Sequence, residues 1–167
     1  AEGRNMDPRA DDDVTDSVHF HVDESVHEGG AWVNDAAGWK YCYADSTCAK
    51  NGPLVIGEDT YYFDANGLMV TGWAFYNDAW HWMGASGRAA TGWVNDRGAW
   101  YFLNDSGQMV TGWTQVNGSW FYLTDSGKMA SGWTKIGGFW YYLQDSGAMA
   151  TGWVKDGRTW YYLNESG

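Results

Sequence analysis

An all-β solenoid of stacked β-hairpins, built from repeats of about 20 residues, is the fold that this sequence predicts. A Thr-Gly-Trp or Ser-Gly-Trp segment recurs every 20 residues, a second tryptophan follows seven residues after each first one, and every interval carries a hairpin-like pattern. The first tryptophans are Trp73, Trp93, Trp113, Trp133 and Trp153, and the second are Trp80, Trp100, Trp120, Trp140 and Trp160.

The last repeat shows how one unit is organised. Residues 152–154 and the β-forming run 159–163 predict two strands, separated by a turn over residues 155–158. A two-residue turn at Asp156-Gly157, a favoured hairpin dipeptide, would make Trp153 and Trp160 direct cross-strand partners. Gly98, Gly118 and Gly138 lie one position later, so we expect a different turn type in those repeats.

A polar loop ending in glycine follows each regular hairpin, and a methionine usually follows the loop. One hairpin is not stable alone in water, so neighbouring hairpins are expected to share a buried core. The loops are 104–107, 124–127, 144–147 and 164–167, the methionines are Met69, Met109, Met129 and Met149, and the core leucines are Leu103, Leu123, Leu143 and Leu163.

Three regions differ in how well they keep the repeat. Residues 1–30 form a non-repetitive acidic arm or linker, residues 31–70 hold degenerate repeats, and residues 71–167 hold the regular ones. Residues 18–22 alternate and predict one strand. Its His19 and His21, with His27, allow a metal site, but surface histidines are the favoured interpretation because no fixed ligand set accompanies them.

Composition excludes several classes of protein. The 167 residues carry a net charge of -11, 18% aromatics and 13 tryptophans, with a mean hydropathy of -0.49. Such a high aromatic content argues against a disordered chain. The absence of a long apolar run argues against a membrane-spanning helix. The acidic net charge argues against nucleic-acid binding. No signal peptide begins at Ala1, which suggests a trimmed secreted chain or a cytosolic one.

The chemistry-bearing residues are few. Cys42 and Cys48 make a poor zinc pattern and are expected to close a short loop as a disulfide, with two separate buried thiols as the alternative. No nucleophile with a base and an orienting group is apparent, so we expect no catalysis, cofactor or metal in this chain. An enzyme activity would belong to a domain outside it.

The aromatic side chains allow two roles. Tryptophan, tyrosine and methionine can serve only as the core of the stack. They can also wall a box for a quaternary ammonium group, whose diffuse charge needs no hydrogen-bond partner. The same rings could stack on sugars, so this chemistry leaves carbohydrate open.

Residues 151–163, Thr-Gly-Trp-Val-Lys-Asp-Gly-Arg-Thr-Trp-Tyr-Tyr-Leu, resemble the repeat of choline-binding modules, the cell-wall anchors of pneumococcal-type surface proteins and lysins. The resemblance implies cages in which two tryptophans of one hairpin meet an aromatic residue of the next, beside the intervening methionine. Carried over, the expected cages are Trp93, Trp100, Tyr122 and Met109; Trp113, Trp120, Tyr142 and Met129; and Trp133, Trp140, Tyr162 and Met149.

Three other units fit this scheme less well. Trp73 and Trp80 would meet Phe102, but Ala89 stands where methionine is expected. Trp32 and Trp39 would meet Phe63 across a disturbed register. Pro53 and Thr60 replace both tryptophans, so that unit should bind nothing, and Trp82 is expected only to pack.

The resemblance implies a secreted, non-catalytic module that is associated with a Gram-positive cell wall and binds choline groups of teichoic acid. A glucan-binding module and a purely structural spacer are the alternatives. A homodimer is left open.

Overall fold

The computed structural model describes residues 29–167, in which every regular element is a β-strand of five residues. The alternating segment 18–22 and His19, His21 and His27 lie outside the described residues. The strands are β1 (Ala31–Asp35), β2 (Gly38–Cys42), β3 (Gly52–Ile56), β4 (Asp59–Phe63), β5 (Gly72–Tyr76), β6 (Ala79–Met83), β7 (Gly92–Asp96), β8 (Ala99–Leu103), β9 (Gly112–Val116), β10 (Ser119–Leu123), β11 (Gly132–Ile136), β12 (Phe139–Leu143), β13 (Gly152–Asp156) and β14 (Thr159–Leu163).

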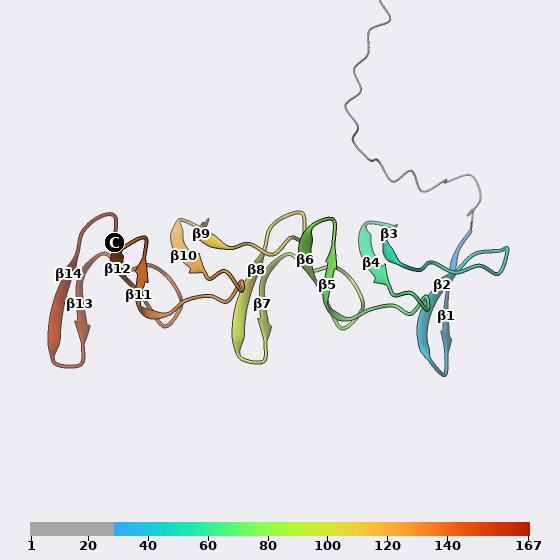
Figure 1. The fold of residues 1–167 in the computed structure, drawn as a ribbon, viewed down its shortest axis with the longest axis horizontal. Helices are drawn as coiled ribbons and strands as arrows, with labels where there is room; N and C mark the ends of the chain where they lie inside the picture. The colour runs from blue at the N-terminus through green and yellow to red at the C-terminus, as the bar shows by residue number, and fades with distance from the viewer. Residues whose placement is uncertain (1–28) are drawn as a thin grey trace, which may run out of the picture.

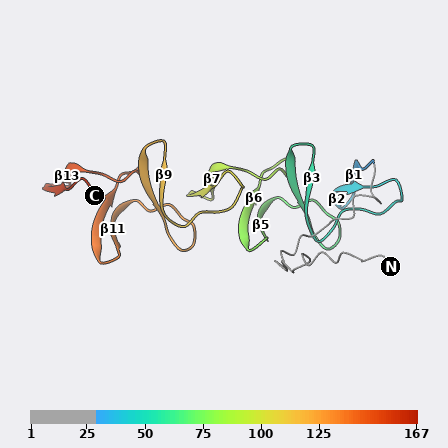
Figure 2. The same cartoon turned by 90° about the horizontal axis from the view of Figure 1, so that it is seen from above.

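Consecutive strands pair as seven separate two-stranded antiparallel sheets within this region. The hairpins follow one another along the long axis of the molecule (Figure 1), which confirms the predicted all-β stack. In the same view β1/β2, β7/β8 and β13/β14 extend toward one side. After a 90° turn β3 and β9 extend to one side and β5 and β11 to the other, so the hairpins radiate around the axis (Figure 2).

The expected pairing of the two tryptophans in a hairpin is wrong. Trp153 lies opposite Tyr162, and Trp160 lies opposite Lys155. The turn residues are 157–158, one position later than the sequence suggested. Trp153 and Trp160 therefore share a face as diagonal neighbours, because every second residue of a strand points to the same side.

All seven described hairpins turn after the same strand position, although the turns differ in backbone conformation. Asn117 and Gly118 both have positive φ, at 48° and 83°, as do Arg97 and Gly98. This is the requirement of a type I′ turn. In the last turn only Gly157 has positive φ. The expected difference in turn type is present, but the position of the turn is constant.

A column of fully buried side chains runs through the stack. Each hairpin from β3/β4 to β11/β12 ends its second strand with one of them: Phe63, Met83, Leu103, Leu123 and Leu143. The loop after each hairpin folds back onto this residue, as in the isolated bridge between Leu143 and Met149. Leu163 is also buried. The predicted leucine core is therefore confirmed, and phenylalanine and methionine replace leucine in the earlier repeats.

The loop glycines allow successive loops to touch. Gly147 has a φ of +84°, and a Cβ at this position would overlap the side chain of Met129 from the preceding loop. Gly127 stands in the same relation to Met109. In the first loop, Cys42 and Cys48 are joined by a disulfide. No helix in the described region is long and apolar enough to cross a bilayer.

Candidate functional site

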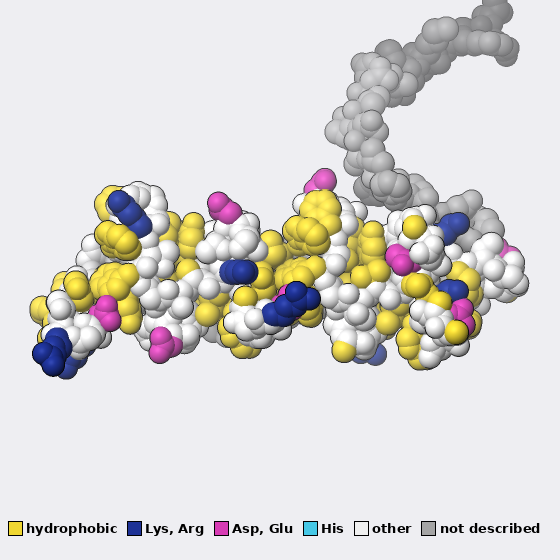
Figure 3. Space-filling model, turned by 60° about the horizontal axis from the view of Figure 1, so that its bottom comes forward, with side chains coloured by type: hydrophobic (Ala, Val, Ile, Leu, Met, Phe, Trp, Pro, Cys, Tyr) yellow, Lys and Arg dark blue, Asp and Glu magenta, His cyan; other side chains and the backbone are white. Residues whose placement is uncertain are grey.

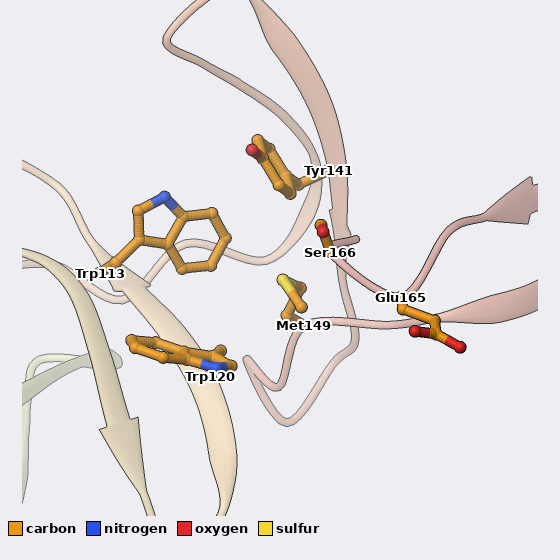
Figure 4. A pocket seen from close by; sticks show the side chains of 6 residues that line it. All are labelled: Trp113, Trp120, Tyr141, Met149, Glu165 and Ser166. Carbon is orange, nitrogen blue, oxygen red and sulfur yellow. The ribbon is translucent and has the colours of Figure 1, made fainter.

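Four side chains from two successive hairpins surround a hollow of about 450 Å³. Trp113 comes from β9, Trp120 from β10, Tyr141 from β12, and Met149 from the loop after β12. Figure 4 shows the two indoles, the phenol ring and the thioether around one opening. Glu165 and Ser166 complete the lining. We call such a set of two tryptophans, one second-strand aromatic residue and one methionine an aromatic cage.

The hairpin register places both tryptophans on one face. Trp113 lies opposite Tyr122, and Trp120 lies opposite Gln115, two positions along. Tyr122 packs against Trp113 edge to face, with ring centroids 5.3 Å apart. From the other side Tyr141 of the next hairpin makes a second edge contact, at 4.9 Å. Trp113 is thus held between its own hairpin and the following one.

A backbone hydrogen bond sets the position of the methionine. The Met149 N–H donates to the carbonyl oxygen of Trp120, with 2.7 Å between nitrogen and oxygen. A Cβ on Gly167 would meet the Met149 sulfur at 2.5 Å, so the following loop closes over this thioether. The methionine is therefore fixed by its own backbone and by the next repeat.

The cage is open to solvent on one side. Trp120 keeps 42% of its surface exposed, so one face of its ring is available. Indole and phenol rings carry negative potential on their faces and attract cations there. No Lys or Arg lines the hollow, and the carboxylate of Glu165 points away from the rings (Figure 4). The site is suited to an apolar cation.

The same arrangement recurs along the molecule. In each case the first tryptophan lies about 4.8–4.9 Å from an aromatic ring of the next hairpin, and the methionine N–H donates to the second tryptophan's carbonyl. The sets are Trp32, Trp39, Tyr61 and Met69; Trp73, Trp80, Tyr101 and Met109; and Trp93, Trp100, Phe121 and Met129. Trp133 also packs on Tyr161 of the next hairpin, with ring centroids 4.8 Å apart. Trp140 lies on the same face of its hairpin as Trp133. Hydrophobic side chains form a band between successive hairpins (Figure 3).

The structure places a different aromatic residue beside each first tryptophan than the resemblance implied. Phe102, Tyr122, Tyr142 and Tyr162, expected to cross to the preceding hairpin, pack on the first tryptophan of their own hairpins. Tyr162 also lines a hollow together with Trp140 of the preceding hairpin. The residue that crosses lies one position earlier: Tyr101, Phe121, Tyr141 and Tyr161. For the first cage, Tyr61 is closer to Trp32 than the buried Phe63 is, at 4.8 Å against 5.9 Å.

The methionines are also reassigned. The backbone N–H of each methionine donates to the carbonyl oxygen of the second tryptophan in the hairpin before its own. Met109 therefore belongs with Trp80, Met129 with Trp100 and Met149 with Trp120. Every expected methionine is thus one repeat too early. Ala89 accordingly belongs with Thr60, to which its N–H donates at 2.8 Å. The Trp73 cage, expected to lack methionine, is complete.

One interface has no cage, as the loss of both tryptophans at Pro53 and Thr60 suggested. His81 stands where other interfaces have the crossing aromatic residue, and Tyr76 stacks on it at 3.7 Å and 10°. Tyr76 also stacks on Tyr62 at 5.3 Å. Burial lowers the pKa of His81 and raises that of Tyr76, because each charged form would lose hydration. The sequence reasoning missed Tyr76, whose position elsewhere holds Ile, Val or Asp.

Two further expectations concern single residues. Trp82 packs on Trp73 within its hairpin at 5.2 Å, which agrees with a packing role. The region from residue 29 onward contains no cluster of three or more His, Cys, Asp or Glu side chains that could hold a metal ion.

A family described as choline-binding repeat matches residues 50–89, 90–131 and 130–167. The chain belongs to this family. Its matched segments span most of the hairpins whose cages are described above. A comparison with curated protein sequences gave no significant match.

Solved structures of pneumococcal proteins resemble this choline-binding repeat chain. Choline-binding protein F from Streptococcus pneumoniae is 37% identical, with a TM-score of 0.75 over 83% of this chain and 51% of that one. CbpJ from the same organism is 35% identical, with a TM-score of 0.74 and the same coverage. A cell-wall endolysin of phage Cp-1 complexed with choline is 36% identical, with a TM-score of 0.54 over 72% of this chain and 37% of that one. This chain thus spans about half or less of each relative.

Proposed function

We propose that this chain is a non-catalytic, secreted module that attaches a protein to a cell wall by binding the choline groups of teichoic acid or a similar envelope polymer. The recurring, solvent-open aromatic cage carries the proposal. The choline complex of the related phage endolysin supports the choice of ligand.

The chemistry of choline fits the Trp113 cage. A trimethylammonium group spreads its charge over methyl groups and has no N–H to donate, so it can leave water without losing strong hydrogen bonds. Two indole faces and a phenol ring supply the attraction, and the methionine thioether fills the remaining side. Such exposed cation–π contacts are worth about 0.5–1 kcal/mol each, so a single cage should bind weakly.

Repetition converts weak sites into firm attachment. Complete cages recur at Trp32, Trp73, Trp93 and Trp113 on one continuous stack. A polymer that bears many choline groups can occupy several cages at once, and each further contact benefits from the raised local concentration. The module should therefore bind the polymer much more tightly than free choline.

A titration of the purified chain with choline, followed by tryptophan fluorescence, tests the proposal. We expect saturation in the millimolar range, with no response to glucose oligomers. A response to the oligomers alone would indicate the carbohydrate-binding alternative, since aromatic rings also stack on sugars.

Retention on a tertiary-amine resin separates binding from a structural spacer role. Trp120→Ala should reduce retention, because Trp120 is an exposed wall of a cage rather than part of the buried column. Val55→Ala is the matched control, since Val55 is exposed on the interface without a cage. Equal retention of both variants and the unaltered chain would support the spacer.

A further inference from the structure

A carboxylate distinguishes two of the tryptophan sites from the others. The indole Nε1–H of Trp73 donates to Asp96 Oδ2 at 3.2 Å, and that of Trp133 donates to Asp156 Oδ2 at 3.0 Å. Asp96 ends β7 and Asp156 ends β13. In both cases the carboxylate comes from the hairpin that also supplies the crossing tyrosine.

The same repeat position is apolar beside the intervening cages. Val116 ends β9, the hairpin that follows Trp93, and Ile136 ends β11, the hairpin that follows Trp113. The register of all these hairpins is the same. The array therefore contains two kinds of tryptophan site, with and without a carboxylate on the edge of the first indole.

The carboxylate should change what the indole attracts. A hydrogen bond from N–H to an anion is charge-assisted and increases electron density in the ring, which strengthens its pull on a cation. The Asp96 side chain is only 24% exposed, so solvent screens its charge incompletely. Arg97 lies 3.9 Å from Asp96 but is 94% exposed, so it offsets little of that charge.

We infer that Asp96 makes the Trp73 site selective for a quaternary ammonium cation over a neutral group of the same shape, and that the more exposed Asp156 does so more weakly at Trp133. The Trp93 and Trp113 cages discriminate less. This inference rests on the proposed function and adds a graded charge preference along the stack. Glu165 does not give the Trp113 cage a comparable negative charge at its rings, because its carboxylate points away from them (Figure 4).

The test compares choline with its neutral carbon isostere, in which a tert-butyl group replaces the trimethylammonium group. Indole N–H resonances of nitrogen-labelled protein, assigned through single Trp→Phe variants, report each site separately. In the unaltered chain we expect the ratio of choline to isostere affinity at Trp73 to exceed that at Trp113 by about three- to tenfold, and the excess to shrink at high salt.

Two variants decide the matter. Asp96→Asn removes the charge but keeps an acceptor for the indole, and should bring the Trp73 ratio down to that of Trp113. Val116→Asp should raise the ratio at Trp93 and leave Trp113 unchanged. Equal ratios at Trp73 and Trp113, or an unchanged ratio in Asp96→Asn, would overturn the inference while choline binding stands. If choline shifted no indole resonance, the proposed function itself would fail.

Discussion

Two interfaces of the solenoid share a backbone and differ in almost every side chain that faces the gap. One lies between hairpins β3/β4 and β5/β6, and the other between β9/β10 and β11/β12. Ala89 N–H donates to Thr60 in the first at 2.8 Å, and Met149 N–H donates to Trp120 in the second at 2.7 Å. The backbone arrangement is therefore kept at an interface that lacks both tryptophans.

Side chains fill the first interface and leave the second open. Tyr76 stacks flat on His81 and covers the face of the ring at the crossing position. At the equivalent crossing position Tyr141 borders a hollow of about 450 Å³. The interface between β3/β4 and β5/β6, which we call the plugged interface, shows that this chain can fill the gap with its own aromatic rings.

The comparison separates stability from binding. Both interfaces keep a fully buried residue at the end of the second strand, Phe63 in one and Leu123 in the other. This column and the loop hydrogen bonds are common to both, whereas the tryptophan pair is not. The pair is therefore not required for stacking, and the interpretation of the aromatics as core alone accounts poorly for half-exposed rings such as Trp120.

The largest expected effect is on stability, from Gly147→Ala. The substitution forces an L-residue to adopt a φ of +84° and overlaps the Met129 side chain. Together these should cost about 2–5 kcal/mol of unfolding free energy. Chemical denaturation measures it.

Gly107→Ala is the matched control for this prediction. Gly107 has a similar φ of +75°, but Ala89 replaces the methionine, and the nearest atom to an added Cβ is a carbonyl oxygen at 3.4 Å. This variant should lose mainly the conformational part, about 1–2 kcal/mol. Equal losses at both positions would show that overlap with Met129 adds nothing to the cost at Gly147.

The next effect is on binding, and it tests which aromatic residue walls the open cage. Tyr141→Ala should weaken choline binding at the Trp113 cage by about tenfold, which corresponds to loss of a partly desolvated cation–π contact. Tyr142→Ala should leave that cage unchanged, because Tyr142 packs on Trp133 at 5.1 Å. The Trp113 indole resonance reports both. The opposite ranking would restore the assignment expected from sequence.

These two tyrosines also show where sequence reasoning stopped. The repeat, the strands and the tryptophan pairs could be read from spacing, since period and β-propensity are local properties. The assignment to residue 142 came from the family resemblance, and spacing alone does not say which face of the second strand meets the preceding hairpin. The turn position does not explain the exchange, because moving it by one residue changes the cross-strand partner by two and leaves each side chain on the same face.

The methionine assignment failed for a different reason. Met129 and Met149 differ by one repeat, so both satisfy any rule based on spacing alone. Only the three-dimensional path of the loop, fixed by the bond from Met149 to Trp120, decides between them. Ala89 was the signal that could have shown the offset of one repeat. The loop that lacks methionine belongs to the interface that lacks tryptophans at Pro53 and Thr60.

A smaller effect is expected from opening the plugged interface. Replacing Pro53 and Thr60 with Trp, His81 with Tyr and Ala89 with Met would reproduce the side chains of the Trp113 cage, and replacing Tyr76 with Val would give the residue that Val116 supplies beside the Trp93 cage. Gly107 already leaves space beside residue 89. We expect one additional choline bound per chain, measured by equilibrium dialysis. Tyr76→Val alone is the control and should add none, while an unchanged stoichiometry in the full variant would show that the cage needs more than these positions.

The smallest effect is a pH dependence confined to the plugged interface. His81 is 3% exposed, and burial lowers its pKa, although the hydrogen-bond geometry between Nδ1 and the Ala79 carbonyl, at 3.2 Å, opposes this shift. Below the ordinary imidazole pKa of 6.5 the unfolded chain therefore binds a proton that the folded chain resists. Stability from this residue is fully present above that pH and decreases as the pH falls toward the lower folded value.

His81→Tyr isolates that contribution, because tyrosine occupies the same repeat position at Tyr61 and Tyr101. The carboxylates of the chain titrate in both proteins, so the quantity to follow is the difference in melting temperature between variant and unaltered chain at about pH 7.5 and about pH 5.5. We expect the difference to shift in favour of the variant at the lower pH, while choline affinity at the Trp113 cage stays the same in both proteins. If the difference in melting temperature were the same at both pH values, the imidazole would be hydrated in the folded state and Tyr76 would not shield this interface from water.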